Sequence, residues 1–317
     1  MYLTEPDTPL YDAYHVGSFN LNGDDMENKK RQQDALDVAS QIENLKSLNL
    51  IVSDEKFASD FLNDVSYFRF IKAYSLGLKP KNGSYYDGVT FEQIVELYLF
   101  NANFRQLLFP LIEKVEVNLR CRIANSFSRK YGVLSYKSSD LFHDKHYHEV
   151  FLKDIEIEIK RNNRAPFIRN FQSNYKDGEI PLYALVEIFS FGTLSKFYKN
   201  MLSIDKKEIA EAFEIGYPYF ESWIESIAYV RNLCAHYGRL YNVKLSKTPM
   251  LYPQDTKKGI TNHRIYGILI CLKHILTSDR QWIEFADNIE FLLEKYPHVE
   301  AQKMGFPSNW KELLIYS

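Results

Sequence analysis

Hydrophobic residues recur every three or four positions along most of the chain, which is the period of an amphipathic α-helix. The longest such stretch covers residues 91–130. Its apolar positions include Ile94, Leu97, Leu108, Leu111, Ile112, Val115, Leu119 and Ile123. Thr90 precedes the stretch as a typical N-cap, and Gly132 follows it as a typical helix end. Because proline lacks the backbone N–H, Pro110 is expected to kink or divide this helix.

Shorter stretches with the same period predict further helices. They cover residues 31–50, 54–62, 67–74, 146–162, 182–201, 205–213, 218–237, 260–277 and 280–295, with a last short helix around Trp310. Ser53 is the expected N-cap of the second of these, and Pro181 suits the first turn of the helix that begins near residue 182. Residues 79–89 and 174–181 are rich in turn-forming residues. Strand-like alternation is scarce, so the predicted fold class is all-α.

Composition and charge narrow the class of protein. The 317 residues include 45% hydrophobic and 25% charged side chains, the usual mixture of a globular protein, which excludes wholesale disorder. Lys and Arg number 39 and Asp and Glu 41, so the formal net charge is 39 − 41 = −2. This balance excludes a protein that coats nucleic acid without regard to sequence, because such binding needs a strong positive field. It leaves a local basic groove possible.

Cysteine usage and hydropathy favour a reduced, cytoplasmic environment. Cys121, Cys234 and Cys271 are far apart and form no CxxC pair, which argues against a zinc ribbon and against a disulfide framework. The first residues show no basic segment followed by an apolar one, so no secretory signal is expected. No uncharged apolar run approaches the roughly 18 residues of a membrane span. We therefore expect a cytoplasmic protein without a membrane partner.

The densest set of reactive side chains lies in residues 229–242, at the end of an amphipathic helix. Asn232, His236 and Arg239 stand at i, i+4 and i+7, which places them on one helical face. Arg231 lies roughly 140° from His236 around the helix and one turn below it. An arginine is long enough to reach the same surface near a helix end. Gly238 is expected to break or cap the helix.

These side chains suit cleavage of a phosphodiester bond in RNA. A neutral histidine can take the proton of a ribose 2′-hydroxyl, and an arginine can bind the phosphate and stabilise its developing charge. Attack by the 2′-oxygen gives a 2′,3′-cyclic phosphate and a free 5′-hydroxyl, without a metal. DNA lacks this nucleophile. The alternative is structural, because Arg and His near a helix C-terminus also satisfy its last carbonyls and its dipole.

The residues around this motif resemble those of the Abi-like (AbiD/AbiF type) abortive-infection proteins of the HEPN superfamily. The matching stretches occur in the family's order and span roughly residues 35–245. They are Thr90-Phe91 with Ile94, Leu97-Tyr98 and Phe100, Arg105–Leu108, Ile112–Glu116 with Arg120, Phe191–Lys196, Glu221–Trp223 and Val230–Asn242. The chain departs from the pattern at Asn101, where Asp is expected. That departure puts in doubt only a local contact on the long helix.

The resemblance implies a HEPN-like helical bundle with helical extensions at both ends. Together with the turn-forming residues and lack of period in the first segment, it divides the chain into a loosely ordered N-terminal arm (1–30), an Abi-like HEPN domain (31–245) and a C-terminal helical extension packed on it (246–317). It also implies a metal-independent endoribonuclease of anti-phage defence that needs no cofactor. Arg231 and His236 are then the catalytic R-x4-H pair, with Asn232 the polar residue between them. Since only one such motif occurs, a homodimer with a composite cleft is implied.

Further residues are expected to support this site. Glu116 and Arg120 form an i, i+4 pair, which is either a plain salt bridge or a second layer that orients Arg231 or His236. Candidate RNA contacts are Arg120, Arg239 and Asn242, with Tyr237 and Tyr241 as stacking partners for an unpaired base. Cys234 reads as a small packing residue rather than a nucleophile.

Several alternatives stay open at this stage. The protein could be a non-catalytic RNA-binding module controlled by a structured small RNA antitoxin, or a target of AMP transfer by a partner nucleotidyltransferase. His143, His146 and His148 could bind a metal, although their stretch reads more like a polar loop that enters a helix. Basic clusters at 29–31 and 161–169 are either solvated faces or phosphate contacts. The aromatic residues Tyr67, Phe68, Phe70 and Tyr74 are expected in the core.

Overall fold

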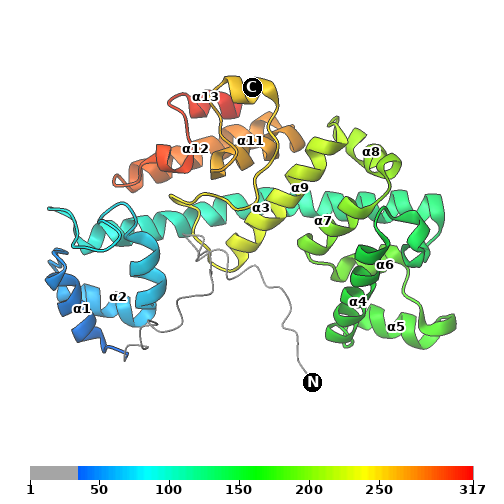
Figure 1. The fold of residues 1–317 in the computed structure, drawn as a ribbon, viewed down its shortest axis with the longest axis horizontal. Helices are drawn as coiled ribbons and strands as arrows, with labels where there is room; N and C mark the ends of the chain where they lie inside the picture. The colour runs from blue at the N-terminus through cyan, green and yellow to red at the C-terminus, as the bar shows by residue number, and fades with distance from the viewer. Residues whose placement is uncertain (1–34, 317) are drawn as a thin grey trace, which may run out of the picture.

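The computed structural model describes residues 35–316, and the regular structure within them is helical (Figure 1). No β-sheet forms in this part of the chain; isolated bridges such as Ile51–Thr90 are its only strand-like pairings. The all-α fold predicted from periodicity is therefore confirmed. The N-terminal arm (1–30) lies outside the described residues, as does the expected start of the first helix.

Helix α3 (Phe91–Tyr131) is the axis around which the other helices pack. Its 41 residues span roughly 60 Å. Thr90 and Gln93 form a reciprocal capping box at its start, and Gly132, at φ 97°, ends it. The expectation that Pro110 divides this helix is wrong, since α3 is continuous. Pro110 and Gln106 are both exposed, so water can bond the Gln106 carbonyl that lacks an N–H partner.

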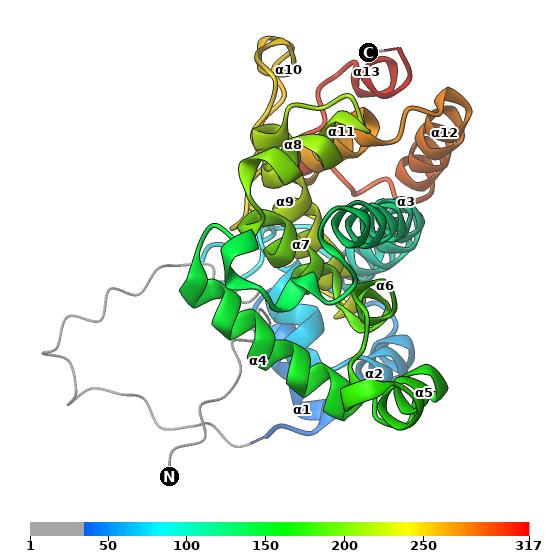
Figure 2. The same ribbon diagram turned by 90° about the vertical axis from the view of Figure 1, so that its right-hand side faces the viewer.

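Separate groups of helices surround α3 (Figures 1 and 2). The N-terminal group is α1 (Val38–Ser47), α2 (Glu55–Asp64) and the π-helix η1 (Phe68–Lys72), followed by the turn-rich loop. The group near the end of α3 is α4 (Lys145–Arg161), α5 (Pro166–Asn174), α6 (Leu182–Leu185), α7 (Phe191–Asn200) and α8 (Ser203–Glu211), with short 3₁₀ turns between them. The C-terminal group is α10 (Pro253–Lys257), α11 (Ile265–Ile275), α12 (Asp279–Lys295) and α13 (Trp310–Ile315). Helix α9 (Tyr217–Ala235) crosses α3 between these groups.

The N-terminal group corrects two expectations. The N-cap of α2 is Asp54 rather than Ser53, because the Asp54 carboxylate accepts the Phe57 N–H at 2.9 Å. In the aromatic segment, Phe70 is fully buried and its ring lies 5.3 Å from that of Phe91. Phe68, by contrast, is 63% exposed, so it does not belong to the core.

A break between α6 and α7 also departs from the predicted single helix over 182–201. After α6 a 3₁₀ turn covers Val186–Ile188, and Phe189 is extended. Ser190 then caps α7 by accepting the Thr193 N–H at 3.0 Å. Because the helix stops here, the Phe189 carbonyl is free of helical bonding and accepts a side chain from α3 instead.

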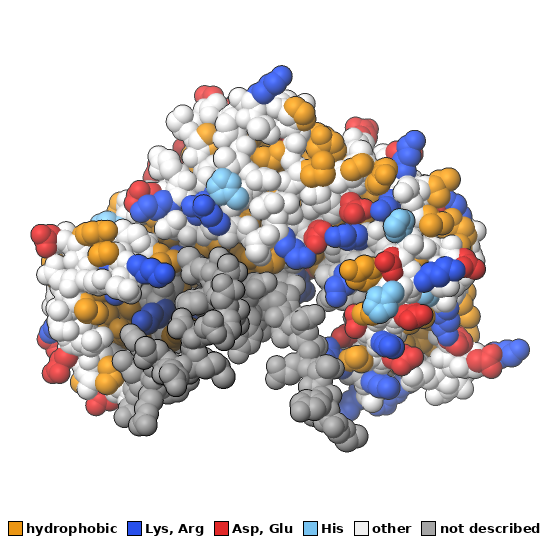
Figure 3. All heavy atoms as spheres, in the orientation of Figure 1, with side chains coloured by type: hydrophobic (Ala, Val, Ile, Leu, Met, Phe, Trp, Pro, Cys, Tyr) orange, Lys and Arg blue, Asp and Glu red, His pale blue; other side chains and the backbone are white. Residues whose placement is uncertain are grey.

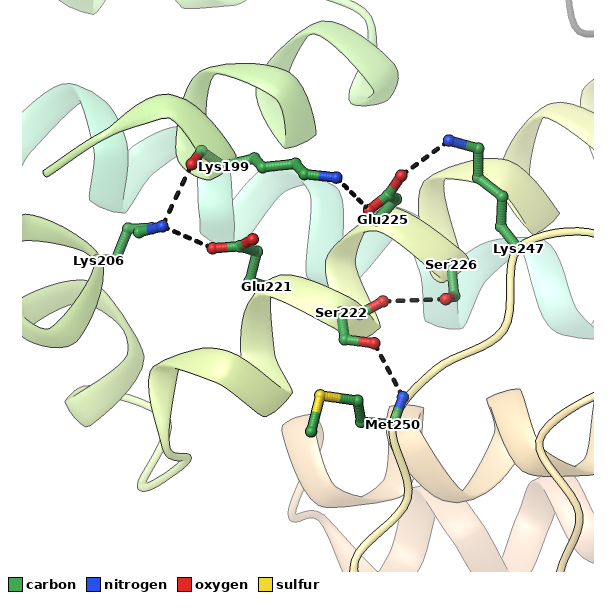
Figure 4. Close-up of polar contacts among 8 residues, drawn as sticks. All are labelled: Lys199, Lys206, Glu221, Ser222, Glu225, Ser226, Lys247 and Met250. Atoms are coloured by element: carbon green, nitrogen blue, oxygen red, sulfur yellow. Dashed lines mark hydrogen bonds and ion pairs between the residues drawn. The ribbon is translucent and has the colours of Figure 1, made fainter. Parts of the chain in front are cut away.

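Helix α9 is anchored to its neighbours along its N-terminal half (Figure 4). Its carboxylates form ion pairs with lysines of α7, α8 and the following loop: Lys206–Glu221 at 2.7 Å, Lys199–Glu225 at 2.9 Å and Lys247–Glu225 at 2.8 Å. The Ser222 hydroxyl accepts the Met250 N–H at 2.8 Å. The chain after α9 is thus tied back along the helix, and the C-terminal end of α9 is left clear of these contacts.

The C-terminal segment lies against α3, on the side away from α6 (Figure 2). Asn103 of α3 donates to the Tyr296 hydroxyl at 2.9 Å, and His298 lies 2.7 Å from Glu96. These contacts agree with the expected packing of residues 246–317, while the division into domains stays a prediction. None of the described helices is long and apolar enough to cross a bilayer.

Candidate functional site

The end of α9 carries the motif, and its shape differs from the expected continuous helix. The helix stops at Ala235, with His236 as C-cap and Tyr237 in the left-handed region at φ 59°. Gly238 N–H donates to the Leu233 carbonyl at 2.6 Å and Tyr237 N–H to the Cys234 carbonyl at 3.3 Å, which is a Schellman motif. A Cβ at Gly238 would lie 2.9 Å from the Leu233 carbonyl oxygen, so this close approach requires glycine.

This turn overturns the shared helical face expected for Asn232, His236 and Arg239. The helix ends before Arg239, so Arg239 belongs to the following loop. The reversal also begins at Tyr237, one residue earlier than the break expected at Gly238. The reason is that the turn is fixed by tertiary contacts, which a helical wheel ignores.

Those tertiary contacts come from Asn101 and Arg105 on α3. Asn101 is fully buried, and its Oδ1 accepts the N–H groups of Leu240 at 2.7 Å and Tyr241 at 3.1 Å. Its Nδ2 donates to the Gly238 carbonyl at 3.3 Å, and Arg105 Nη1 donates to the same carbonyl at 3.1 Å. The residue that departs from the family pattern is therefore the one that holds the loop after His236.

Arg231 is held from α3 by a carboxylate. Glu116 Oε2 lies 3.4 Å from Arg231 Nε, and Glu116 Oε1 accepts from Arg120 Nη2 at 2.9 Å. Arg120 Nη2 also donates to the Phe189 carbonyl at 2.9 Å. The Glu116–Arg120 pair is thus a salt bridge that also contacts Arg231, while its role in orienting Arg231 or His236 stays a prediction. The Arg231 side chain is 29% exposed, so it is half-buried beside α3.

A pocket of about 250 Å³ lies beside this cluster. It is lined by Phe109, Glu113, Glu116, Val117, Arg120, Glu187 and Arg231. The guanidinium of Arg231 lies 5.8 Å from the centre of the Phe109 ring. His236 does not line this pocket, so the two residues of the R-x4-H motif face different surroundings within one chain.

His236 and Tyr237 are exposed at the end of α9. The His236 side chain makes no hydrogen bond to any residue between 35 and 316, and neither does the half-buried Asn232 side chain. Tyr237, 68% exposed, is contacted by Arg69, whose Nη1 donates to the Tyr237 carbonyl at 3.5 Å and whose guanidinium lies 5.6 Å from the ring centre. Sequence reasoning missed Arg69, because nothing in its aromatic surroundings signals a contact with a motif so far along the chain.

The remaining motif residues mostly anchor the loop. Tyr241 is buried, its ring packs edge-on against Phe100, and its hydroxyl accepts the Glu300 N–H at 3.4 Å. The expectation that Tyr241 stacks on a base conflicts with this burial. Asn242 donates to the Leu76 carbonyl at 3.4 Å and accepts from Arg264 at 3.5 Å. It therefore ties the loop to two other segments.

Cys234 is buried between the two catalytic candidates. Burial raises the pKa of its thiol to about 12, so it stays protonated at neutral pH. The three cysteines are free thiols. Cys234 is accordingly a packing residue rather than a nucleophile.

The histidines near 143–148 are not arranged as a metal site. His148 is buried, its Nε2 donates to the Tyr136 carbonyl at 2.8 Å, and its ring stacks on Phe142. Asp144 caps α4, as expected for a polar loop that enters a helix. Between residues 35 and 316, no three metal-binding side chains are grouped to hold an ion.

Charged side chains elsewhere are mixed in sign. Figure 3 shows Lys and Arg interspersed with Asp and Glu over the face that carries α7–α9. In the basic stretch 161–169, Arg161 pairs with Glu158 at 2.6 Å and Arg169 donates to the Asn163 carbonyl at 3.2 Å. The cluster at 29–31 lies outside the described residues. The described residues on this face therefore form no extended basic patch.

Fold and site together define an all-helical protein in which an R-x4-H motif ends a central helix braced by acidic and polar residues of a longer one. The chain belongs to the Abi-like protein family, whose model matches residues 60–242. Membership of this family points to abortive infection, a bacterial defence against phage. The matched region includes the Glu116–Arg120 pair and the whole motif from 229 to 242. No curated protein and no solved structure matches the chain.

Proposed function

We propose that this protein is a metal-independent endoribonuclease of the HEPN type that acts in abortive infection. Arg231 and His236 are its catalytic pair, with Asn232 beside them. The observation that carries the proposal is the contrast between these two side chains. Arg231 forms an ion pair with Glu116, with its Nε buried and without a hydrogen bond, whereas His236 is exposed at the C-cap of the same helix without a protein partner among the described residues. A structural histidine at this position would be expected to bond a carbonyl or a carboxylate.

In the proposed reaction, His236 removes the proton of the ribose 2′-hydroxyl. The 2′-oxygen forms a bond to phosphorus as the bond to the 5′-oxygen breaks, which leaves a 2′,3′-cyclic phosphate. Arg231 stabilises the charge that develops on the phosphate oxygens. A proton must also reach the departing 5′-oxygen, on the opposite side of the phosphorus. One imidazole cannot hold both positions at once, which supports a homodimer in which a second copy supplies the acid.

The decisive variant is His236→Ala, because an exposed side chain can be removed without loss of packing. His146→Ala is the matched control, since His146 is also exposed and lies on α4, far from the motif in sequence. Purified protein is incubated with RNA in EDTA, and the fragment ends are mapped. We expect cyclic phosphate and 5′-hydroxyl ends, a loss of at least about 100-fold in His236→Ala, and an unchanged rate in the control.

Absence of cleavage by folded protein, or cleavage that requires a metal, would refute the ribonuclease proposal. Phage protection and RNA affinity that survive His236→Ala would instead favour an RNA-binding module controlled by a small RNA. The homodimer is tested separately by light scattering, where a monomeric mass of 37.3 kDa would contradict it.

A further inference from the structure

Three arginines from distant parts of the chain converge on the loop that follows His236. Arg239 belongs to the loop itself, Arg69 contacts Tyr237, and Arg264, the N-cap residue of α11, contacts Asn242. The backbone beside Arg239 is fixed, because the buried Asn101 amide accepts the N–H groups of Leu240 and Tyr241.

None of the three arginines forms an ion pair within residues 35–316. Arg120, Arg161 and Arg231 pair with glutamates, whereas arginines such as Arg122 and Arg129 have no ion pair in this part of the chain either. What distinguishes Arg69, Arg239 and Arg264 is that all three belong to or contact one loop. A carboxylate close to the loop, that of Glu300, pairs with Lys303 at 2.5 Å, and the Glu300 backbone N–H contacts Tyr241.

The electrostatic consequence is clearest at Arg239. Burial lowers the pKa of its guanidinium, and the charge of Arg264 lowers it further, whereas only the phenols of Tyr74 and Tyr241 act in the opposite direction. Two cations held near each other in a partly desolvated place repel, and a bound anion would relieve that repulsion. The repulsion between these guanidiniums thus favours binding of an anionic ligand.

We infer that Arg69, Arg239 and Arg264 form a binding surface for the phosphodiester backbone of single-stranded RNA, next to His236. Guanidiniums suit this ligand because they bind phosphate through two parallel hydrogen bonds. The exposed Tyr237 ring adds a platform on which an unpaired base can stack between phosphate contacts. This inference rests on the proposed function, since it states how the substrate is held. It also gives the C-terminal segment a role, because Arg264 lies outside the matched family region.

The test is RNA affinity as a function of salt, measured with cleavage abolished. A fluorescein-labelled 20-nucleotide RNA of mixed, unstructured sequence is titrated with full-length His236→Ala protein between 50 and 300 mM KCl. Arg69→Gln, Arg239→Gln and Arg264→Gln are added singly in this background. The control is Arg122→Gln, because Arg122 is also half-buried and also lies over an aromatic ring, that of Phe213.

Each of the three substitutions, Arg69→Gln, Arg239→Gln and Arg264→Gln, is expected to lower the slope of log K against log salt by about 0.7. Each should also weaken RNA binding about fivefold at 0.1 M salt. Arg264→Lys should retain most of the slope, since it keeps the charge. Thermal unfolding is used to check that each variant is folded. If Arg239→Gln is not folded, the Arg69 and Arg264 variants alone test the inference.

The inference would be overturned if the three arginine variants matched Arg122→Gln in both salt slope and RNA affinity. Absence of RNA binding by His236→Ala would overturn it as well. These outcomes are distinct from those of the cleavage assay. RNA binding that depends on the three arginines without any cleavage would retain this surface and reject the ribonuclease. Cleavage by wild-type protein, together with a salt slope that the three substitutions leave unchanged, would retain the ribonuclease and reject this surface.

Discussion

Removal of the Asn101 side chain should destabilise the protein more than any other single polar substitution on α3. Asn101→Ala leaves the N–H groups of Leu240 and Tyr241 without acceptors, and both residues are at most 3% exposed. A buried backbone donor without a partner costs about 1–3 kcal/mol. The Gly238 carbonyl keeps its bond from Arg105, so it adds little. The two donors together give a loss of roughly 2–6 kcal/mol.

The assay is urea denaturation followed by circular dichroism. Asn103→Ala is the matched control, because Asn103 lies two residues away on the same helix and loses a bond to a tyrosine hydroxyl that can rotate. That variant should lose only about 1 kcal/mol. Asn101→Asp should lie between wild type and Asn101→Ala, since a carboxylate still accepts both N–H groups and can attract Arg105.

A second readout locates the effect. Amide hydrogen exchange should rise at residues 238–241 in Asn101→Ala before it rises in the rest of the core, because these donors are the ones released. If Asn101→Ala loses no more stability than Asn103→Ala, or if loop exchange is unchanged, then Asn101 does not hold the loop and the account of this turn is refuted.

Three other predictions follow from burial and contact. Only Cys121 should react with iodoacetamide in folded protein at pH 8, because burial raises the pKa of Cys234 to about 12; labelling of more than one thiol by mass spectrometry would contradict this. Gly267→Ala should cost about 1–3 kcal/mol in urea, since its Cβ would lie 2.5 Å from a backbone oxygen, whereas Gly192→Ala, with its nearest atom at 3.6 Å, should be nearly neutral. If the proposed ribonuclease activity is present, Glu116→Gln should slow RNA cleavage by about 10- to 100-fold in folded protein, because it removes the charge paired with Arg231, the proposed catalytic arginine; an unchanged kcat would show that this carboxylate is only structural.

Much of the helical framework could be predicted because it depends on local pattern. The period of apolar residues gave α3, α4 and α9 nearly to their ends, and the caps Thr90 and Gly132 were recognisable as residue types. The helix predictions failed where contacts with residues distant in the sequence determine the local structure. The break at Phe189 and the continuity of α3 through Pro110 depend on which carbonyls find partners, and no window of sequence contains those partners.

The same distinction between local pattern and tertiary contacts applies to the candidate site. Arg231, His236 and the Glu116–Arg120 pair could be found from sequence, because their residue types and spacing are themselves the signal. The burial of Tyr241 could not be predicted from sequence, since it depends on contacts with Phe100 and with the chain around Glu300.

The amino-acid sequence by itself determined which segments are helical and which side chains carry reactive groups, because helical period and residue chemistry are local properties. Only the tertiary structure decided where α9 stops and which way the groups beyond it face. Two residues of α3 hold that loop: Asn101, whose buried amide bonds three backbone groups more than a hundred residues away, and Arg105, which bonds one of the same groups. The tertiary structure also brings Arg69 and Arg264 to the same loop, where they contact the Tyr237 carbonyl and the Asn242 side chain.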